Sequence, residues 1–223
     1  MASKRNRKKV KFKWTKELII LIVALVALLT VTIILAIPSQ DKKNLTKWND
    51  AITAYNTENS TSYSTLGSTD IHLKEVSGSD EALFNKVRSI SDTDGYTYFF
   101  YGSLTNATYL EQLSKINSLA TEYKIENVYL VYATFYEEAD ADNETDTVSF
   151  RQTCDKYEDI LNTGKNGDAT EIDLTVYPAM FVYKNNSLIF NTQVGKDSNE
   201  YSWSIYIQKA FSFEMNEKAK SEN

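Results

Sequence analysis

The chain has 223 residues, enough for one ordinary domain with additional segments, and its 42% hydrophobic and 13% aromatic content excludes a wholly disordered protein. The formal net charge is −6, but eight Lys and Arg residues lie within the first 16 positions, which contain no acidic residue. Beyond Glu17, 16 basic and 29 acidic side chains leave a net charge of −13. A surface that acidic repels phosphate backbones, so we expect no nucleic-acid partner.

The amino-terminal segment has the pattern of a membrane anchor. Residues 1–17 form a basic tail, and the 20 residues 18–37 (LIILIVALVALLTVTIILAI) carry no charge. A helix of that length spans about 30 Å, the thickness of the hydrocarbon core of a bilayer. The charge asymmetry predicts a single-pass protein of the cell membrane, with a cytoplasmic amino terminus and an extracytoplasmic domain. The competing interpretation is a cleaved signal peptide, whose apolar region is usually shorter, about 7–15 residues.

Residues 38–70 are predicted to connect the anchor to the domain. Apolar side chains at spacings of three and four indicate a short amphipathic helix over residues 43–56; they are Leu45, Trp48, Ile52 and Tyr55. Residues 57–70 (TENSTSYSTLGSTD) are rich in Ser, Thr and Asn. This composition favours a flexible spacer.

Residues 71–223 are predicted to form one α/β domain in which strands and helices alternate. Runs of β-branched and aromatic residues predict strands at 71–76, 96–102, 127–134, 179–184 and 187–194. Apolar stripes predict helices starting at Ser79 or Asp80 and at about 107–124, 149–162 and 199–216. Strands that alternate with helices pair in parallel, and Asn185-Asn186 indicates a tight antiparallel hairpin. The expected fold is therefore a mixed sheet flanked by helices and preceded by one transmembrane helix.

Three segments of this domain resemble the thioredoxin fold, over about Ile71 to Phe213. They are the first strand, the segment 100–104 (FYGSL) that leads into the helix at Ala107, and the segment 177–195 (YPAMFVYKNNSLIFNTQVG). The resemblance implies that the Tyr177–Pro178 peptide is cis. It also implies a surface that receives an extended peptide, formed by Leu104, Thr105, Tyr177, Pro178 and Val194.

The chain departs from this family at the residues that carry its chemistry. Where the family has two cysteines, this chain has Thr105-Asn106-Ala107-Thr108. Thiol–disulfide exchange requires an attacking thiolate and a resolving thiol, and threonine supplies neither. We therefore expect no redox activity and no enzyme of that class. The single cysteine, Cys154, lies on the apolar stripe of a predicted helix, which indicates a buried thiol; an intermolecular disulfide is the minority alternative.

No cofactor or metal site is expected from the remaining motifs. The single histidine, His72, has no neighbouring cysteine or histidine. Residues 137–146 (EEADADNETD) contain six acidic residues, and Asp140, Asp142 and Glu144 have the spacing of the opening of a calcium loop. However, the glycine and the closing glutamate of such a loop are replaced by Thr145 and Arg151, which favours a solvated acidic loop.

These observations favour a binding module over an enzyme. The first hypothesis is a membrane-tethered, redox-inactive thioredoxin-like domain that binds a protein or peptide at the extracytoplasmic surface, as an accessory of an export or envelope complex. Its contact with the lipid bilayer is through residues 18–37. Two alternatives remain open at this point: a purely structural domain with a vestigial groove, and an enzyme that binds a small thiol at the start of the Ala107 helix.

Overall fold

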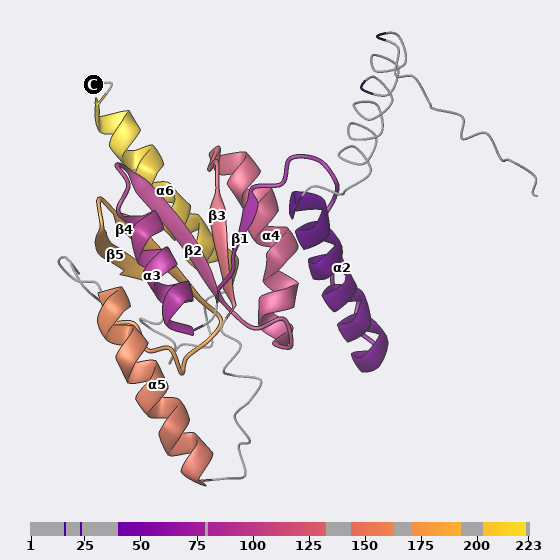
Figure 1. Ribbon diagram of the computed structural model, residues 1–223. Helices are drawn as coiled ribbons and strands as arrows, with labels where there is room; N and C mark the ends of the chain where they lie inside the picture. Colours follow the sequence, from indigo (N-terminus) through magenta and orange to yellow (C-terminus); the bar gives the residue numbers. More distant parts are fainter. Residues whose placement is uncertain are drawn as a thin grey trace, which may run out of the picture. The chain divides into compact units, whose positions relative to one another are not determined.

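The computed structural model describes Lys16, Val23 and residues 40–78, 80–132, 144–162, 171–192 and 203–221. The chain divides into two compact units, residues 1–43 and residues 44–223, and the second contains nearly all the described elements. In chain order these are α2 (Gln40–Asn59), β1 (Leu73–Val76), α3 (Asp80–Ser91), β2 (Tyr96–Gly102), α4 (Ala107–Tyr123), β3 (Val128–Tyr132), α5 (Glu144–Asn162), β4 (Ala179–Lys184), β5 (Ser187–Asn191) and α6 (Trp203–Ser221) (Figure 1).

The strands form one mixed five-stranded sheet in the order β1-β3-β2-β4-β5. β3 pairs in parallel with both β1 and β2, whereas β4 runs antiparallel to β2 and β5 antiparallel to β4. The hairpin between β4 and β5 turns at Asn185 and Asn186, both with positive φ. The predicted alternation of strands and helices and the predicted antiparallel hairpin are thus confirmed.

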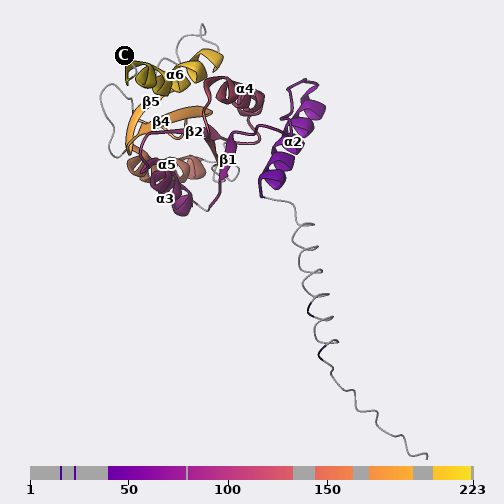
Figure 2. The same cartoon turned by 90° about the horizontal axis from the view of Figure 1, so that it is seen from above.

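Helices cover both faces of the sheet. α4 and α6 lie on one face, and α3 and α5 lie on the other (Figure 2). Each face has its own apolar cluster, because alternate residues of the strands point to opposite sides. Phe100 of β2 belongs to the cluster under α4 and α6, and its neighbours Phe99 and Tyr101 belong to the cluster under α3 and α5.

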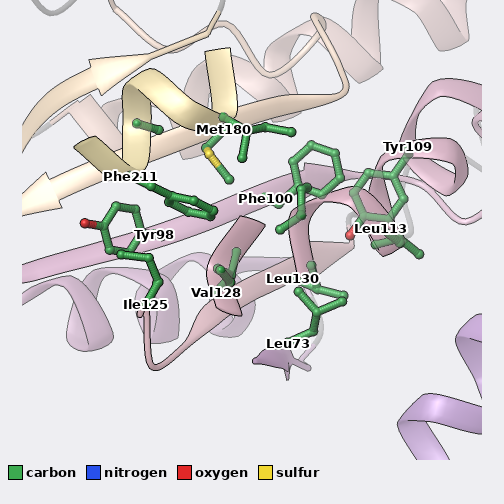
Figure 3. Packing of buried hydrophobic residues seen from close by; sticks show 14 of the residues in the cluster. Leu73, Tyr98, Phe100, Tyr109, Leu113, Ile125, Val128, Leu130, Met180 and Phe211 are labelled. Carbon is green, nitrogen blue, oxygen red and sulfur yellow. The ribbon is translucent and has the colours of Figure 1, made fainter. Parts of the chain in front are cut away.

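The central strand β2 is the most buried element of the sheet. Its sequence, YTYFFYG, is buried from Thr97 to Gly102, because the strand has neighbours on both edges and helices on both faces. On the α4 face, the Phe100 ring stacks on the Tyr109 ring with centroids 4.5 Å apart and planes 3° apart. Figure 3 shows these two rings among the labelled side chains of this cluster, with Met180 and Leu113 nearby.

The segment before β1 differs from the predicted spacer. The predicted amphipathic helix is present, but α2 extends to Asn59, and Trp48, Ile52 and Leu66 are buried in the cluster under α4 and α6. The side-chain amide of Asn49 holds Leu66 in place, because its Oδ1 accepts from the Leu66 N–H (2.8 Å) and its Nδ2 donates to the Leu66 carbonyl (3.0 Å). This segment therefore packs as part of the domain.

Two predictions fall outside the described residues. The proposed transmembrane helix, residues 18–37, is described only at Val23, and no helix within the described ranges has the length and apolarity needed to cross a membrane. The acidic segment 137–146 is described only from Glu144, where α5 begins, so the calcium-like spacing at Asp140 and Asp142 remains a prediction without a structural test.

Gly102 leads to the first testable prediction. A Cβ at this position would lie 2.4 Å from Cδ2 of Tyr109, whose ring is fully buried and stacked on Phe100. The ring has no room to move away, so Gly102→Ala should lower the free energy of unfolding by about 1–3 kcal/mol. The measurement is chemical denaturation of the full chain.

Gly67→Ala is the matched control, because a Cβ there would have no atom within 4 Å. It should change the free energy of unfolding by less than about 0.5 kcal/mol. Equal stability of the two variants would contradict the packing of Tyr109 on Gly102.

Candidate functional site

The sheet brings four of the five predicted binding residues to one end. In the antiparallel pair of β2 and β4, Tyr101 is opposite Ala179. The chain therefore leaves β2 through Gly102 at the same end of the sheet at which Tyr177 and Pro178 lead into β4. Leu104 and Thr105 follow in the loop between β2 and α4. The fifth residue, Val194, lies outside the described residues.

The loop between β2 and α4 is a tight, hydrogen-bonded turn. The Ser103 and Thr105 hydroxyl oxygens are 2.8 Å apart, and the Thr105 N–H donates to the Ser103 hydroxyl at 3.2 Å. The Asn106 N–H donates to the Ser103 carbonyl at 3.1 Å. Asn106 is the N-cap of α4, because its side chain accepts from the Tyr109 N–H at 2.9 Å. These bonds fix the backbone from Ser103 into the first turn of α4.

The predicted residues present different surfaces at this end of the sheet. Thr105 is exposed, and Leu104 is half-buried against the cluster under α4 and α6. Tyr177 is half-buried against the cluster on the opposite face, under α3 and α5, while Pro178 is buried. The Tyr177–Pro178 peptide is cis, as predicted. Leu104 and Tyr177 therefore flank the end of the sheet from its two faces, with the turn at Thr105 between β2 and α4.

The segment that leads into Tyr177 is held by an ion-pair network. Arg151 of α5 lies 2.9 Å from Asp173, 3.2 Å from Glu158 and 2.8 Å from Asp155. Glu158 in turn accepts from the Leu174 N–H at 2.8 Å. Burial raises the pKa of the Glu158 carboxyl, and the Leu174 N–H and Arg151 oppose that rise. This network holds Asp173 and Leu174, three to four residues before Tyr177.

The end of the sheet contains hydroxyl and amide groups but no thiol. Thr105 and Thr108 stand where the resembled family has cysteines, and a threonine hydroxyl cannot carry out thiol–disulfide exchange. Cys154 lies instead in α5, where it is fully buried against the cluster under α3 and α5. Burial, with a smaller effect of the Glu158 carboxylate, raises the pKa of this thiol to about 12. Among the described residues, no group of three or more His, Cys, Asp or Glu side chains is arranged to hold a metal ion.

Ser103 and Asn106 shape this loop although neither is among the predicted site residues. A signal for both is present in the sequence. Ser103, Thr105 and Asn106 stand directly before the first apolar positions of a helix, and side chains of these types commonly cap helices and form hydroxyl-stabilised turns.

Comparison of the chain with protein-family models, with curated proteins and with solved structures finds no match.

The buried thiol leads to a prediction about reactivity. Because its pKa is raised from 9.0 to about 12, the thiolate fraction of Cys154 at pH 8 should be about a thousandfold smaller than in the unfolded chain. Iodoacetamide should therefore alkylate the folded chain at least about tenfold more slowly than the chain in denaturant, because the greater nucleophilicity of a thiolate with a higher pKa offsets part of this loss. Mass spectrometry of timed samples measures both rates, and no other cysteine contributes to the signal. Comparable rates would show that Cys154 is accessible.

Proposed function

We propose that the chain is a membrane-tethered, redox-inactive thioredoxin-like module that binds a protein or peptide partner on the extracytoplasmic side of the membrane. The observation that carries this proposal is the register of β2 and β4. Because Tyr101 lies opposite Ala179 in this pair, the Ser103–Thr105 turn and the Tyr177–Pro178 segment lie at the same end of the sheet. No observation among the described residues favours a structural role alone or the binding of a small thiol over this function.

The thioredoxin-like part of the proposal is supported by the order and pairing of the elements. The parallel strands β1, β3 and β2 are followed by the antiparallel pair β4 and β5, and helices lie on both faces. Two of the resembled segments support the proposal by their positions: one forms the loop after the central strand β2, and the other contains the proline directly before β4.

The binding role is supported by the chemistry of the surface. With threonine at positions 105 and 108, the loop has no group for thiol exchange, but its backbone is held by the Ser103 and Asn106 side chains. A loop that is already ordered loses little conformational entropy when a partner binds. Leu104 and Tyr177 are half-buried and supply an apolar and an aromatic contact on either side of the turn.

The membrane part of the proposal is supported by the sequence. The 20 uncharged residues 18–37 follow eight basic residues and precede the acidic domain. This charge order favours a cytoplasmic tail and an extracytoplasmic domain.

Site-specific photocrosslinking tests the binding surface. A benzophenone amino acid replaces Thr105 in the full chain, expressed in the membranes of the source cells, and light is applied to intact cells. The exposed residue Asp94, in the turn at the opposite end of β2, is the control position. We expect a discrete adduct from position 105 and none from position 94.

A substitution then tests whether the adduct reports binding. Leu104→Asp places a carboxylate on the proposed apolar contact, and it should weaken binding of the identified partner by about tenfold or more. Asp94→Ala should leave binding unchanged. Equal adducts from both ends of the sheet, or full binding by Leu104→Asp, would contradict this surface.

Protease accessibility tests the proposed topology. Protease added to intact cells or protoplasts should digest the chain beyond Pro38 and leave the basic tail undigested, because the charge asymmetry places the tail in the cytoplasm. Antibodies to tags at the two ends follow the fragments, and permeabilised cells, in which both ends are digested, are the control. Survival of the carboxyl-terminal tag in intact cells would overturn this orientation.

A further inference from the structure

A polar cleft opens at the end of the sheet opposite to the candidate site. The pairing of β2 with β4 begins at Tyr96, whereas the pairing of β2 with β3 begins two residues later, at Tyr98. The start of β2 therefore extends beyond its ladder with β3. The cleft beside it has a volume of about 350 Å³, within the range of about 300–1,000 Å³ in which proteins bind small molecules.

Two chain segments form facing walls of this cleft, and hydrogen bonds hold each of them. One wall is the segment 93–97, in which the Gly95 N–H donates to Oδ1 of Asn185 in the β4–β5 hairpin at 2.8 Å. The other wall is the segment 124–127, which begins where α4 ends. Lys124 has a left-handed backbone (φ 57°), and its N–H donates to carbonyls in the last turn of α4. The shape of the cleft is therefore set by the fold.

The third wall is α6, which contributes Glu214 and Lys218. Nζ of Lys218 donates to Oε1 of Glu214 at 2.6 Å, and the Tyr98 hydroxyl donates to Oε2 at 3.3 Å. Figure 3 shows that this hydroxyl points out of the apolar cluster to which the Tyr98 ring belongs. The charge of Glu214 is thus balanced within the wall by Lys218.

Three further charged side chains line the cleft, and all three are exposed. They are Asp94 on one wall and Lys124 and Glu126 on the other. Among the described residues, these side chains make no hydrogen bond or ion pair, and no hydrogen bond joins the two walls. Because Glu214 and Lys218 balance each other, the cleft offers two carboxylates and one ammonium group to a ligand.

We propose that this cleft binds a small basic amino acid, a molecule with two cationic groups and one carboxylate. The two cationic groups complement the carboxylates of Asp94 and Glu126, and the carboxylate complements the Lys124 ammonium group. The net charge of −13 beyond Glu17 attracts a ligand of net positive charge to this domain. The site does not depend on the proposed partner-binding surface at the other end of the sheet.

Nuclear magnetic resonance of the isotopically labelled full chain in detergent tests this site, with L-lysine as the probe. We expect saturable chemical-shift changes at the Gly95 and Lys124 amides and none at the Thr105 amide, which lies at the other end of the sheet. L-glutamate, whose net charge is negative, should give no saturable change. Absence of saturable changes at the cleft with L-lysine, or equal binding of L-lysine and L-glutamate, would overturn the proposal.

Three variants with changes at exposed positions test the assigned contacts. Asp94→Asn should weaken L-lysine binding about two- to fivefold, the effect of losing one exposed ion pair. Asp92→Asn removes the same charge outside the cleft and is the matched control, which should bind L-lysine as the wild type does. Lys124→Asn keeps a residue that tolerates the left-handed backbone. It should weaken L-lysine binding by a similar factor without weakening the binding of cadaverine, which has no carboxylate.

The comparison between these variants separates a specific site from a general attraction. Equal effects of Asp94→Asn and Asp92→Asn would mean that net charge alone draws the probe to the domain, and would overturn the site. Weaker cadaverine binding by Lys124→Asn would overturn the contact between Lys124 and the carboxylate of the ligand.

Discussion

The close packing of the Tyr109 ring on Gly102 is the constraint on which the geometry of this domain depends. The ring occupies the space that a Cβ on Gly102 would take, so α4 approaches the end of β2 more closely than any other residue would allow. The same ring stacks on Phe100 and meets Tyr132 edge to face. One aromatic side chain thereby sets the position of the first turn of α4 against both β2 and β3.

The turn before α4 follows from this packing. The ring of Tyr109 packs on the sheet, and its backbone N–H donates a hydrogen bond to the Asn106 side chain. Between the end of β2 at Gly102 and the cap at Asn106 only three residues remain, and the Ser103 hydroxyl spans them by accepting from the Thr105 N–H. The loop thus has its ends fixed by packing and its middle fixed by a side-chain hydrogen bond.

Local patterns in the sequence predicted most of the elements because each has a distinct period or composition. The helix expected at 107–124 differs from α4 by one residue, since a regular apolar stripe runs along its length. α5 begins at Glu144, five residues before the predicted start at 149, because the acidic composition around Glu144 and Asp146 favours a solvated loop. Acidic residues are common in the first turn of a helix, where they interact favourably with its dipole.

The packing of α2 and the following segment could not be predicted in this way. The average composition of residues 57–70 indicates a spacer, yet Leu66 is buried and two asparagine side chains of α2 form hydrogen bonds with the backbone of this segment. Asn49 bonds both backbone groups of Leu66, and Asn56 does the same for Tyr63. These are contacts between residues 7 to 17 positions apart, and no periodic pattern marks them.

The candidate site was predictable only in part, for the same reason. The location of the site follows from the order of the strands in the sheet, which the alternation of strands and helices suggests. Its surface depends on which side chains are buried and which remain exposed to solvent. The Ser103 hydroxyl and the Asn106 amide are occupied by the turn itself. The recognition that we propose at this end of the sheet therefore rests on Leu104, Thr105 and Tyr177, which are half-buried or exposed. Threonine at positions 105 and 108 leaves this loop without a thiol, and the proposed binding function uses only its ordered shape.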